Sequence, residues 1–148
     1  AMNILVSACL LGVPCRYDGK SRPCAALLAL RSRCRLIPVC PETAGGLPTP
    51  RTPCERCADR VLDRDGRDRT AAYQKGAASA LKVARRFGCT AAVLKSKSPS
   101  CGCDGIYDGS FSGTLTDGVG VTAQLLLQNK ISVYSEEQLA LLEARHGI

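Results

Sequence analysis

Three cysteines each follow a short apolar run typical of a β-strand. Cys9 comes after residues 3–8, Cys40 after residues 36–39, and Cys101 shortly after residues 91–94. The carboxyl ends of parallel strands share one edge of a sheet, where α/β proteins bind ligands, so thiolates distant in sequence can converge there. Thiolates are ligands for zinc and for iron–sulfur clusters. The spacing therefore predicts a metal or iron–sulfur site at this edge.

A second set of cysteines offers a different site. Cys54 and Cys57 form a Cys-x-x-Cys pair, and Cys101 with Cys103 can complete a four-thiolate zinc site. A redox Cys-x-x-Cys usually opens a helix after a strand, whereas this pair follows two prolines in a predicted loop. A structural zinc site therefore stays open as the alternative. The remaining candidate ligands are interpreted as structural or surface residues: Cys15, Cys24, Cys34, Cys89 and His146.

Predicted strands alternate with predicted helices along the whole chain. The strands are expected at residues 3–8, 35–39, 89–94 and 131–134. The helices are expected at residues 23–33, from 69 or 70 to 87, at 121–129 and after Ser135. This alternation predicts one doubly wound, Rossmann-like α/β domain over residues 1–148, with a mainly parallel sheet and helices on both faces. Two long Gly- and Pro-rich loops, 40–54 and 95–120, carry many of the candidate residues, as functional loops often do.

The composition is that of a globular protein with an ordinary core. The chain has 148 residues, of which 45% are hydrophobic and 22% are charged, so a core can form without disulfides. The first residues lack the pattern of an export signal, and no apolar run approaches the roughly 18 residues of a membrane helix. We therefore expect a cytoplasmic protein with reduced thiols, no membrane partner, and a monomeric or homodimeric state.

A formal net charge of +7 raises the question of nucleic acid binding. Four aspartates alternate with four arginines between residues 59 and 69, which indicates a solvated, locally neutralised surface. The chain has two Phe, four Tyr and no Trp, so it offers few side chains for stacking single-stranded bases. A small anionic or nucleobase-like ligand therefore fits as well as RNA, which is possible but not favoured.

Five motifs together resemble a known bacterial family. They are Ser7-Ala-Cys-Leu-Leu-Gly, Arg16-Tyr-Asp-Gly, Cys40-Pro-Glu, Gly45-Gly-Leu-Pro-Thr-Pro-Arg and Lys95-Ser-Lys-Ser-Pro-Ser-Cys-Gly. The chain resembles, over nearly its whole length, the family that includes thiouracil desulfidase. The resemblance implies a [4Fe-4S] cluster held by three cysteines. It also implies a desulfidase that removes sulfur from thiolated nucleobases or nucleosides without net redox change, the substrate sulfur binding the open iron.

The resemblance also implies roles for individual residues. Cys9 and Cys101 match ligand positions, Glu42 matches the acid/base position, and Ser98 matches a serine that assists catalysis. The stretch matching the family's middle ligand, residues 44–46, contains no thiol, so Cys40 is the nearest candidate for that ligand.

Elementary chemistry gives these residues compatible roles. A carboxylate such as Glu42 can take a proton from water, and Ser98 can orient the water or the base ring. We expect the substrate to be bound by Lys95 and Lys97, which can stabilise negative charge or hold a phosphate, and by Arg16 and Asp18, which can shape the pocket.

Plainer interpretations stay open beside these. Glu42 can pair with Arg51 or cap a turn, and Ser98 can initiate a proline turn. The alternative function is a zinc-stabilised basic module that binds RNA or another anionic ligand.

Overall fold

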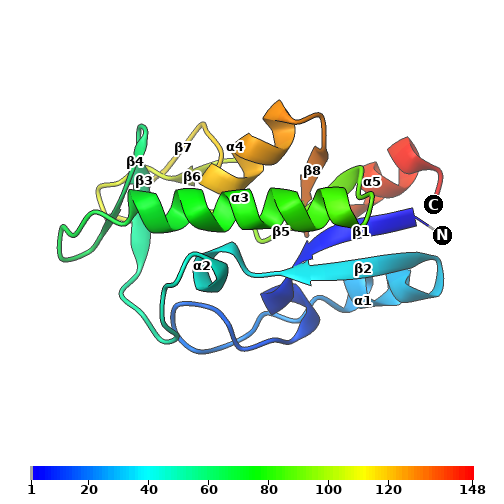
Figure 1. Ribbon diagram of the computed structural model, residues 1–148, viewed down its shortest axis with the longest axis horizontal. Coiled ribbons are helices and arrows are strands. Elements are labelled where there is room, and N and C mark those ends of the chain that lie inside the picture. Colours follow the sequence, from blue (N-terminus) through cyan, green and yellow to red (C-terminus); the bar gives the residue numbers. More distant parts are fainter. Residues whose placement is uncertain (1) are drawn as a thin grey trace.

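A parallel four-stranded sheet forms the centre of the protein in a computed structural model that describes residues 2–148 (Figure 1). Its strands are β1 (Met2–Ser7), β2 (Cys34–Val39), β5 (Ala91–Leu94) and β8 (Ser132–Ser135), in the spatial order β2-β1-β5-β8. All three strand pairings are parallel. The predicted doubly wound α/β architecture is confirmed.

Helices cover both faces of this sheet. On one face, Ile4 and Val6 pack with residues of α1 (Ala25–Ala29) and α5 (Leu139–His146). On the other, Leu5 packs with residues of α3 (Thr70–Arg86) and α4 (Val121–Gln128). Strands buried on both faces read as continuous apolar runs, which is why Ile4-Leu5-Val6 and residues 91–94 identified their strands.

No helix in the described part of the chain combines the length and apolarity needed to cross a membrane.

The order of the strands reverses between β1 and β5. The chain passes from β1 through α1 to β2 on one side, then returns along α3 to β5 on the other side of β1. Connections that diverge in this way leave a crevice at the carboxyl ends of the two strands. Cys9 and Cys101 follow these two strands, so the topology places both beside the crevice.

Three elements form where the sequence predicted irregular loops. They are the short helix α2 (Pro41–Ala44), the hairpin of β3 (Cys54–Cys57) with β4 (Arg60–Asp63), and the hairpin of β6 (Ile106–Tyr107) with β7 (Leu115–Thr116). The loop expected around Cys54 and Cys57 is therefore wrong, since both lie in a strand paired with β4.

A buried carboxylate orders the segment after this hairpin. Asp63 is only 2% exposed and accepts the backbone N–H groups of Asp65 and Arg67 at 2.9 Å each. It also pairs with Arg69, with 3.5 Å between Nε and Oδ2. Part of the expected solvated surface is therefore a structured turn that leads into α3.

Helix α2 lies directly against α3, and two glycines allow the close approach. A Cβ atom at Gly76 of α3 would overlap the carbonyl oxygen of Pro41, and one at Gly45 would overlap the carbonyl oxygen of Ala72. Neither position tolerates a side chain without moving backbone. The contact fixes the position of α2, and therefore of the Glu42 backbone, relative to α3.

We expect Gly76→Ala to destabilise the protein although alanine is the better helix former. Overpacking against the Pro41 carbonyl costs about 1–3 kcal/mol, which exceeds the roughly 1 kcal/mol gained in helix propensity. Urea unfolding followed by circular dichroism measures the change. Ala78→Gly on the exposed side of α3 is the control for propensity alone and should cost about 1 kcal/mol. A Gly76→Ala protein more stable than wild type would contradict the close contact.

Candidate active site

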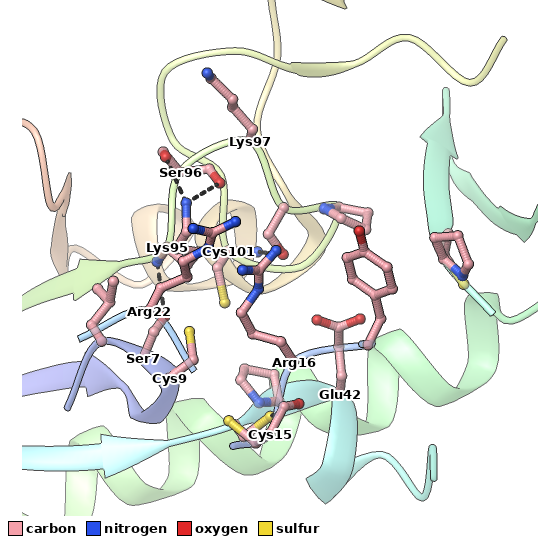
Figure 2. Close-up of a pocket in the computed structure, with 18 of the residues that line it drawn as sticks. Ser7, Cys9, Cys15, Arg16, Arg22, Glu42, Lys95, Ser96, Lys97 and Cys101 are labelled. Atoms are coloured by element: carbon pink, nitrogen blue, oxygen red, sulfur yellow. Dashed lines mark hydrogen bonds between the residues drawn. The ribbon is translucent and has the colours of Figure 1, made fainter. Parts of the chain in front are cut away.

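A pocket of about 760 Å³ opens at the carboxyl edge of the sheet (Figure 2). The segments after β1, β2 and β5 contribute to it, and both hairpins supply part of its wall. Eight of the nine residues that the sequence singled out line this pocket: Cys9, Arg16, Cys40, Glu42, Lys95, Lys97, Ser98 and Cys101. Asp18 is outside the lining and contacts Arg16 instead, with 3.9 Å between its carboxylate and the guanidinium.

The three predicted thiol ligands come from three different strand ends. Cys9 lies in the 3₁₀ turn Ala8–Leu11, Cys40 precedes the first residue of α2, and Cys101 follows β5. Cys9 and Cys101 are 7% and 5% exposed, and Cys40 is half-buried. Figure 2 shows the sulfur atoms of Cys9 and Cys101 on the pocket side of their backbones.

A fourth thiol, that of Cys15, lies beside these three, whereas we interpreted Cys15 from the sequence as a structural or surface residue. It is buried and lies within hydrogen-bonding contact of both Cys9 and Cys40. Its carbonyl oxygen accepts a hydrogen bond from Arg51 Nη2 at 2.9 Å and lies 3.8 Å from the sulfur of Cys40. The only signal in the sequence is its place in the Gly/Pro loop after the first strand, which folds back so that Arg22 N–H donates to the carbonyl of Cys9.

In the protein without metal, raised pKa values hold the thiols of Cys40 and Cys101 in their neutral form at pH 7. The hydrogen bond with Cys15, together with burial, raises the pKa of Cys40 far above its usual value. Burial and the nearby charge of Glu42 raise the pKa of Cys101 to about 12, although Ser7 and Ser100 lower it in part. Metal binding therefore displaces protons from these groups.

The donor set fits an iron–sulfur cluster better than a zinc ion. Within residues 2–148, no three ligands converge as a single metal ion requires. The alternative zinc set is dispersed, because Cys57 is exposed and the Cys103 thiol donates to Gln138 Oε1 at 3.6 Å. A cluster is held differently, since each thiolate binds a different iron and the thiolates surround the cluster.

Glu42 lies at the start of α2, opposite the thiols. The hydroxyl of Tyr73 donates to its Oε2 at 2.5 Å, and Arg51 Nε is 3.5 Å from the same oxygen. The expected pairing with Arg51 is thus present. Since both partners bind Oε2, Oε1 remains available to a molecule in the pocket. Figure 2 shows the carboxylate directed into the pocket and not toward the sheet.

Ser98 organises the loop that carries Cys101. Its Oγ accepts the backbone N–H groups of Ser100 and Cys101 at 3.1 Å each, so it does form the expected turn. These bonds use the oxygen as acceptor and leave the hydroxyl hydrogen for a ligand. The preceding Lys95 is fixed at both ends, because its N–H donates to Ser7 Oγ at 2.9 Å and its Nζ pairs with Glu136 at 3.1 Å.

Arg16 extends into the pocket with an unused donor. Its Nη1 is buried and has no hydrogen-bond partner among residues 2–148. A buried donor without a partner costs free energy, roughly 1–3 kcal/mol, unless a ligand or water completes it. Arg16 is therefore the group in this pocket best prepared to bind an acceptor atom such as a carbonyl oxygen.

Thiol alkylation of the metal-free protein tests this arrangement. At pH 8 we expect iodoacetamide to modify exposed Cys57 far faster than Cys101, because Cys101 is 5% exposed and its pKa is raised to about 12. The raised pKa means that Cys101 stays protonated as the pH rises from 7 to 9, so its rate should remain low over that range. Peptide mapping by mass spectrometry gives each rate. Equal rates for the two cysteines would contradict the buried placement of Cys101.

Comparison with known proteins gives one consistent family. The model of the 2-thiouracil desulfurase family matches residues 4–138. The "Uncharacterized protein YbbK" of Bacillus subtilis (strain 168) is 39% identical over 146 residues, covering 92% of this chain and 97% of its own length. The solved structure of "[4Fe-4S]-dependent thiouracil desulfidase TudS" superposes with a TM-score of 0.94 at 45% identity and covers 99% of each chain.

Proposed function

The chain belongs to the 2-thiouracil desulfurase family, and from this membership we propose that it is a [4Fe-4S]-dependent desulfidase. Its substrate class is a thiolated pyrimidine base or nucleoside such as thiouracil. The observation that carries the proposal is the pocket at the strand-order reversal, where thiols from three strand ends face a carboxylate. The similarity to the thiouracil desulfidase structure over 99% of the chain supports it.

We assign the cluster to Cys9, Cys40 and Cys101. When bound by three thiolates, a [4Fe-4S] cluster supplies one iron with a vacant coordination position, which attracts a soft ligand such as thiocarbonyl sulfur. These cysteines come from the segments after three neighbouring strands, so the sheet holds them at fixed separations. Cys15 contacts two of them and is the structural competitor of Cys40 for the middle position.

The net reaction replaces sulfur by oxygen on the pyrimidine ring. Water is the only co-reactant: its oxygen forms the new bond to the ring carbon, the C–S bond breaks, and hydrogen sulfide leaves with no net transfer of electrons. Glu42 Oε1 is the atom we assign as the proton acceptor from the attacking water, since Oε2 already binds Tyr73 and Arg51. The same carboxyl group can later return the proton.

Neighbouring side chains bind and orient the ring. Arg16 Nη1 can donate to a ring carbonyl oxygen, which would complete its missing hydrogen bond. The Ser98 hydroxyl hydrogen can donate to the ring or the water, and the positive charge of Lys95 favours negative charge that develops on the ring. Lys97 lies in the same loop and also lines the pocket, and Asp18 acts through its contact with Arg16.

Iron analysis of cysteine variants tests the ligand assignment. We expect Cys9→Ser, Cys40→Ser and Cys101→Ser, each prepared and reconstituted without oxygen, to lose most of the approximately four irons and four sulfides of a cubane cluster. Cys15→Ser should retain them. The matched controls are Cys34→Ser and Cys89→Ser, because Cys34 opens β2 and Cys89 precedes β5, at the ends of the strands away from the pocket. Cluster loss in Cys15→Ser with retention in Cys40→Ser would exchange the roles of these two residues.

Turnover of 2-thiouracil and 4-thiouracil by the reconstituted protein tests the activity itself. The wild-type protein should release sulfide and the oxo product in equal amounts. Glu42→Gln keeps the size of the side chain but removes the proton acceptor, so we expect kcat to fall by about 10²–10⁴-fold with the iron content unchanged. Glu143→Gln, on α5 and paired with Arg33, is the control. A Glu42→Gln protein with wild-type kcat would remove Glu42 from the mechanism, and a wild-type protein that releases no sulfide from either compound would overturn the desulfidase assignment.

A further inference from the structure

A buried tyrosine outside the expected set of residues contacts the proposed base. Tyr73 belongs to the first turn of α3 and is 1% exposed. Its hydroxyl donates to Glu42 Oε2 at 2.5 Å, across 31 residues of sequence. Burial and the negative charge of Glu42 raise the pKa of Tyr73 well above its usual value, so the phenol keeps the proton that it donates.

The backbone around this contact has little freedom. Gly76 lies three residues after Tyr73, about one turn along α3. The Pro41 carbonyl occupies the space that a side chain at Gly76 would need. Gly45 meets the Ala72 carbonyl in the same way at the other end of α2. Glu42 lies between these two contact points, so the distance between its backbone and the Tyr73 ring is fixed from both ends of the short helix.

The second partner of Glu42 is equally anchored. Arg51 is 5% exposed in its side chain and reaches Glu42 Oε2 through Nε at 3.5 Å. Its terminal nitrogens are occupied elsewhere, with Nη2 donating to Cys15 O at 2.9 Å and Nη1 donating to Pro48 O at 3.1 Å. Arg51 thus supplies charge near Oε2, while Tyr73 supplies the short hydrogen bond to that atom.

We propose that Tyr73 is a positioning residue that fixes the rotation of the Glu42 carboxylate and presents Oε1 to the water in the pocket. The inference rests on the proposed function, since it gives Glu42 the role of proton acceptor. Tyr73 acts on the pocket through Glu42, because its hydroxyl donates to Oε2 and Tyr73 does not belong to the pocket lining. The hydroxyl also lies beside the thiol of Cys54, which has no role in the proposed reaction.

Tyr73→Phe removes only the hydroxyl and tests this role. We expect kcat to fall by about 10–100-fold, since a small misplacement of a catalytic group has effects of that order. KM and the iron and sulfide content should stay within about twofold of wild type, because the thiol beside the Tyr73 hydroxyl is that of Cys54, which is not one of the three assigned cluster ligands. Tyr134→Phe is the matched control, since Tyr134 is also buried and its hydroxyl contacts His146, outside the pocket lining.

A double variant separates positioning from a general structural effect. If Tyr73 acts through Glu42, then Tyr73→Phe should cost nothing further in kcat once Glu42→Gln is present. A purely structural defect would instead lower kcat of the double variant by the product of the two single fold-losses. That product, or a wild-type kcat in Tyr73→Phe, would overturn the inference.

A measurement on the metal-free protein keeps the inference testable whatever the activity. In protein labelled with ¹³C at glutamate carboxyl carbons, the Glu42 resonance is assigned by its absence in Glu42→Gln. It should shift in Tyr73→Phe and remain in place in Tyr134→Phe, because only the first variant loses a hydrogen bond to that carboxylate. An unmoved resonance would overturn the inference. Absence of sulfide release by wild type with a shifted resonance would instead overturn the desulfidase assignment and leave the positioning contact established.

Discussion

The reversal of strand order between β1 and β5 is the constraint on which the site depends. Four parallel strands end at one edge of the sheet, and the two connections that leave β1 and β5 in opposite directions cannot cover the space between them. The pocket occupies that space, and the segments after β1, β2 and β5 deliver thiols to it. The core on both faces of the sheet holds these ends in place, so the spacing of the proposed ligands is a property of the whole fold.

A second constraint, the approach of α2 to α3, places the proposed acid–base group near the thiols. Only one residue separates Cys40 from Glu42, yet the two lie in different parts of the pocket. Cys40 directly follows β2, whereas Glu42 belongs to the first turn of α2. The glycine contacts bring that helix so close to α3 that a buried tyrosine reaches the carboxylate. The proposed ligand Cys40 and the proposed base Glu42 are therefore oriented by separate contacts, one in the sheet and one between helices.

The sequence was sufficient for the periodic parts of the fold and for residues at strand ends. Runs such as Ile4-Leu5-Val6 identify buried strands because both faces are covered, and their ends locate Cys9, Cys40 and Cys101 at one edge. Loop geometry was not predictable in this way. Cys15 joins the thiols only because its loop folds back along the chain.

Local signals were also overridden by tertiary contacts. Ser135 has the contacts of a helix cap, because Gln138 Oε1 accepts its N–H at 3.0 Å and its own Oγ accepts the N–H of Glu137 at 3.1 Å. Ser135 nevertheless remains paired in β8, and α5 begins only at Leu139. Tyr73 carried no signal at all, because its partner lies 31 residues away and a single tyrosine at helical spacing reads as core.

The charges around the pocket explain why a net charge of +7 does not by itself indicate a nucleic-acid site. Lys95 is paired with Glu136 and Arg51 with Glu42, so these cations are largely compensated where they lie. Arg16 differs, because its contact with Asp18 is long and its Nη1 has no partner in the described chain. The pocket therefore combines internal ion pairs with a buried donor on Arg16 that an acceptor atom of a small polar ring can complete. It is also lined by Arg22, Arg64 and Lys97, which form no ion pair among residues 2–148. The electrostatics of the pocket therefore suit a small polar ring and also an anionic group beside it.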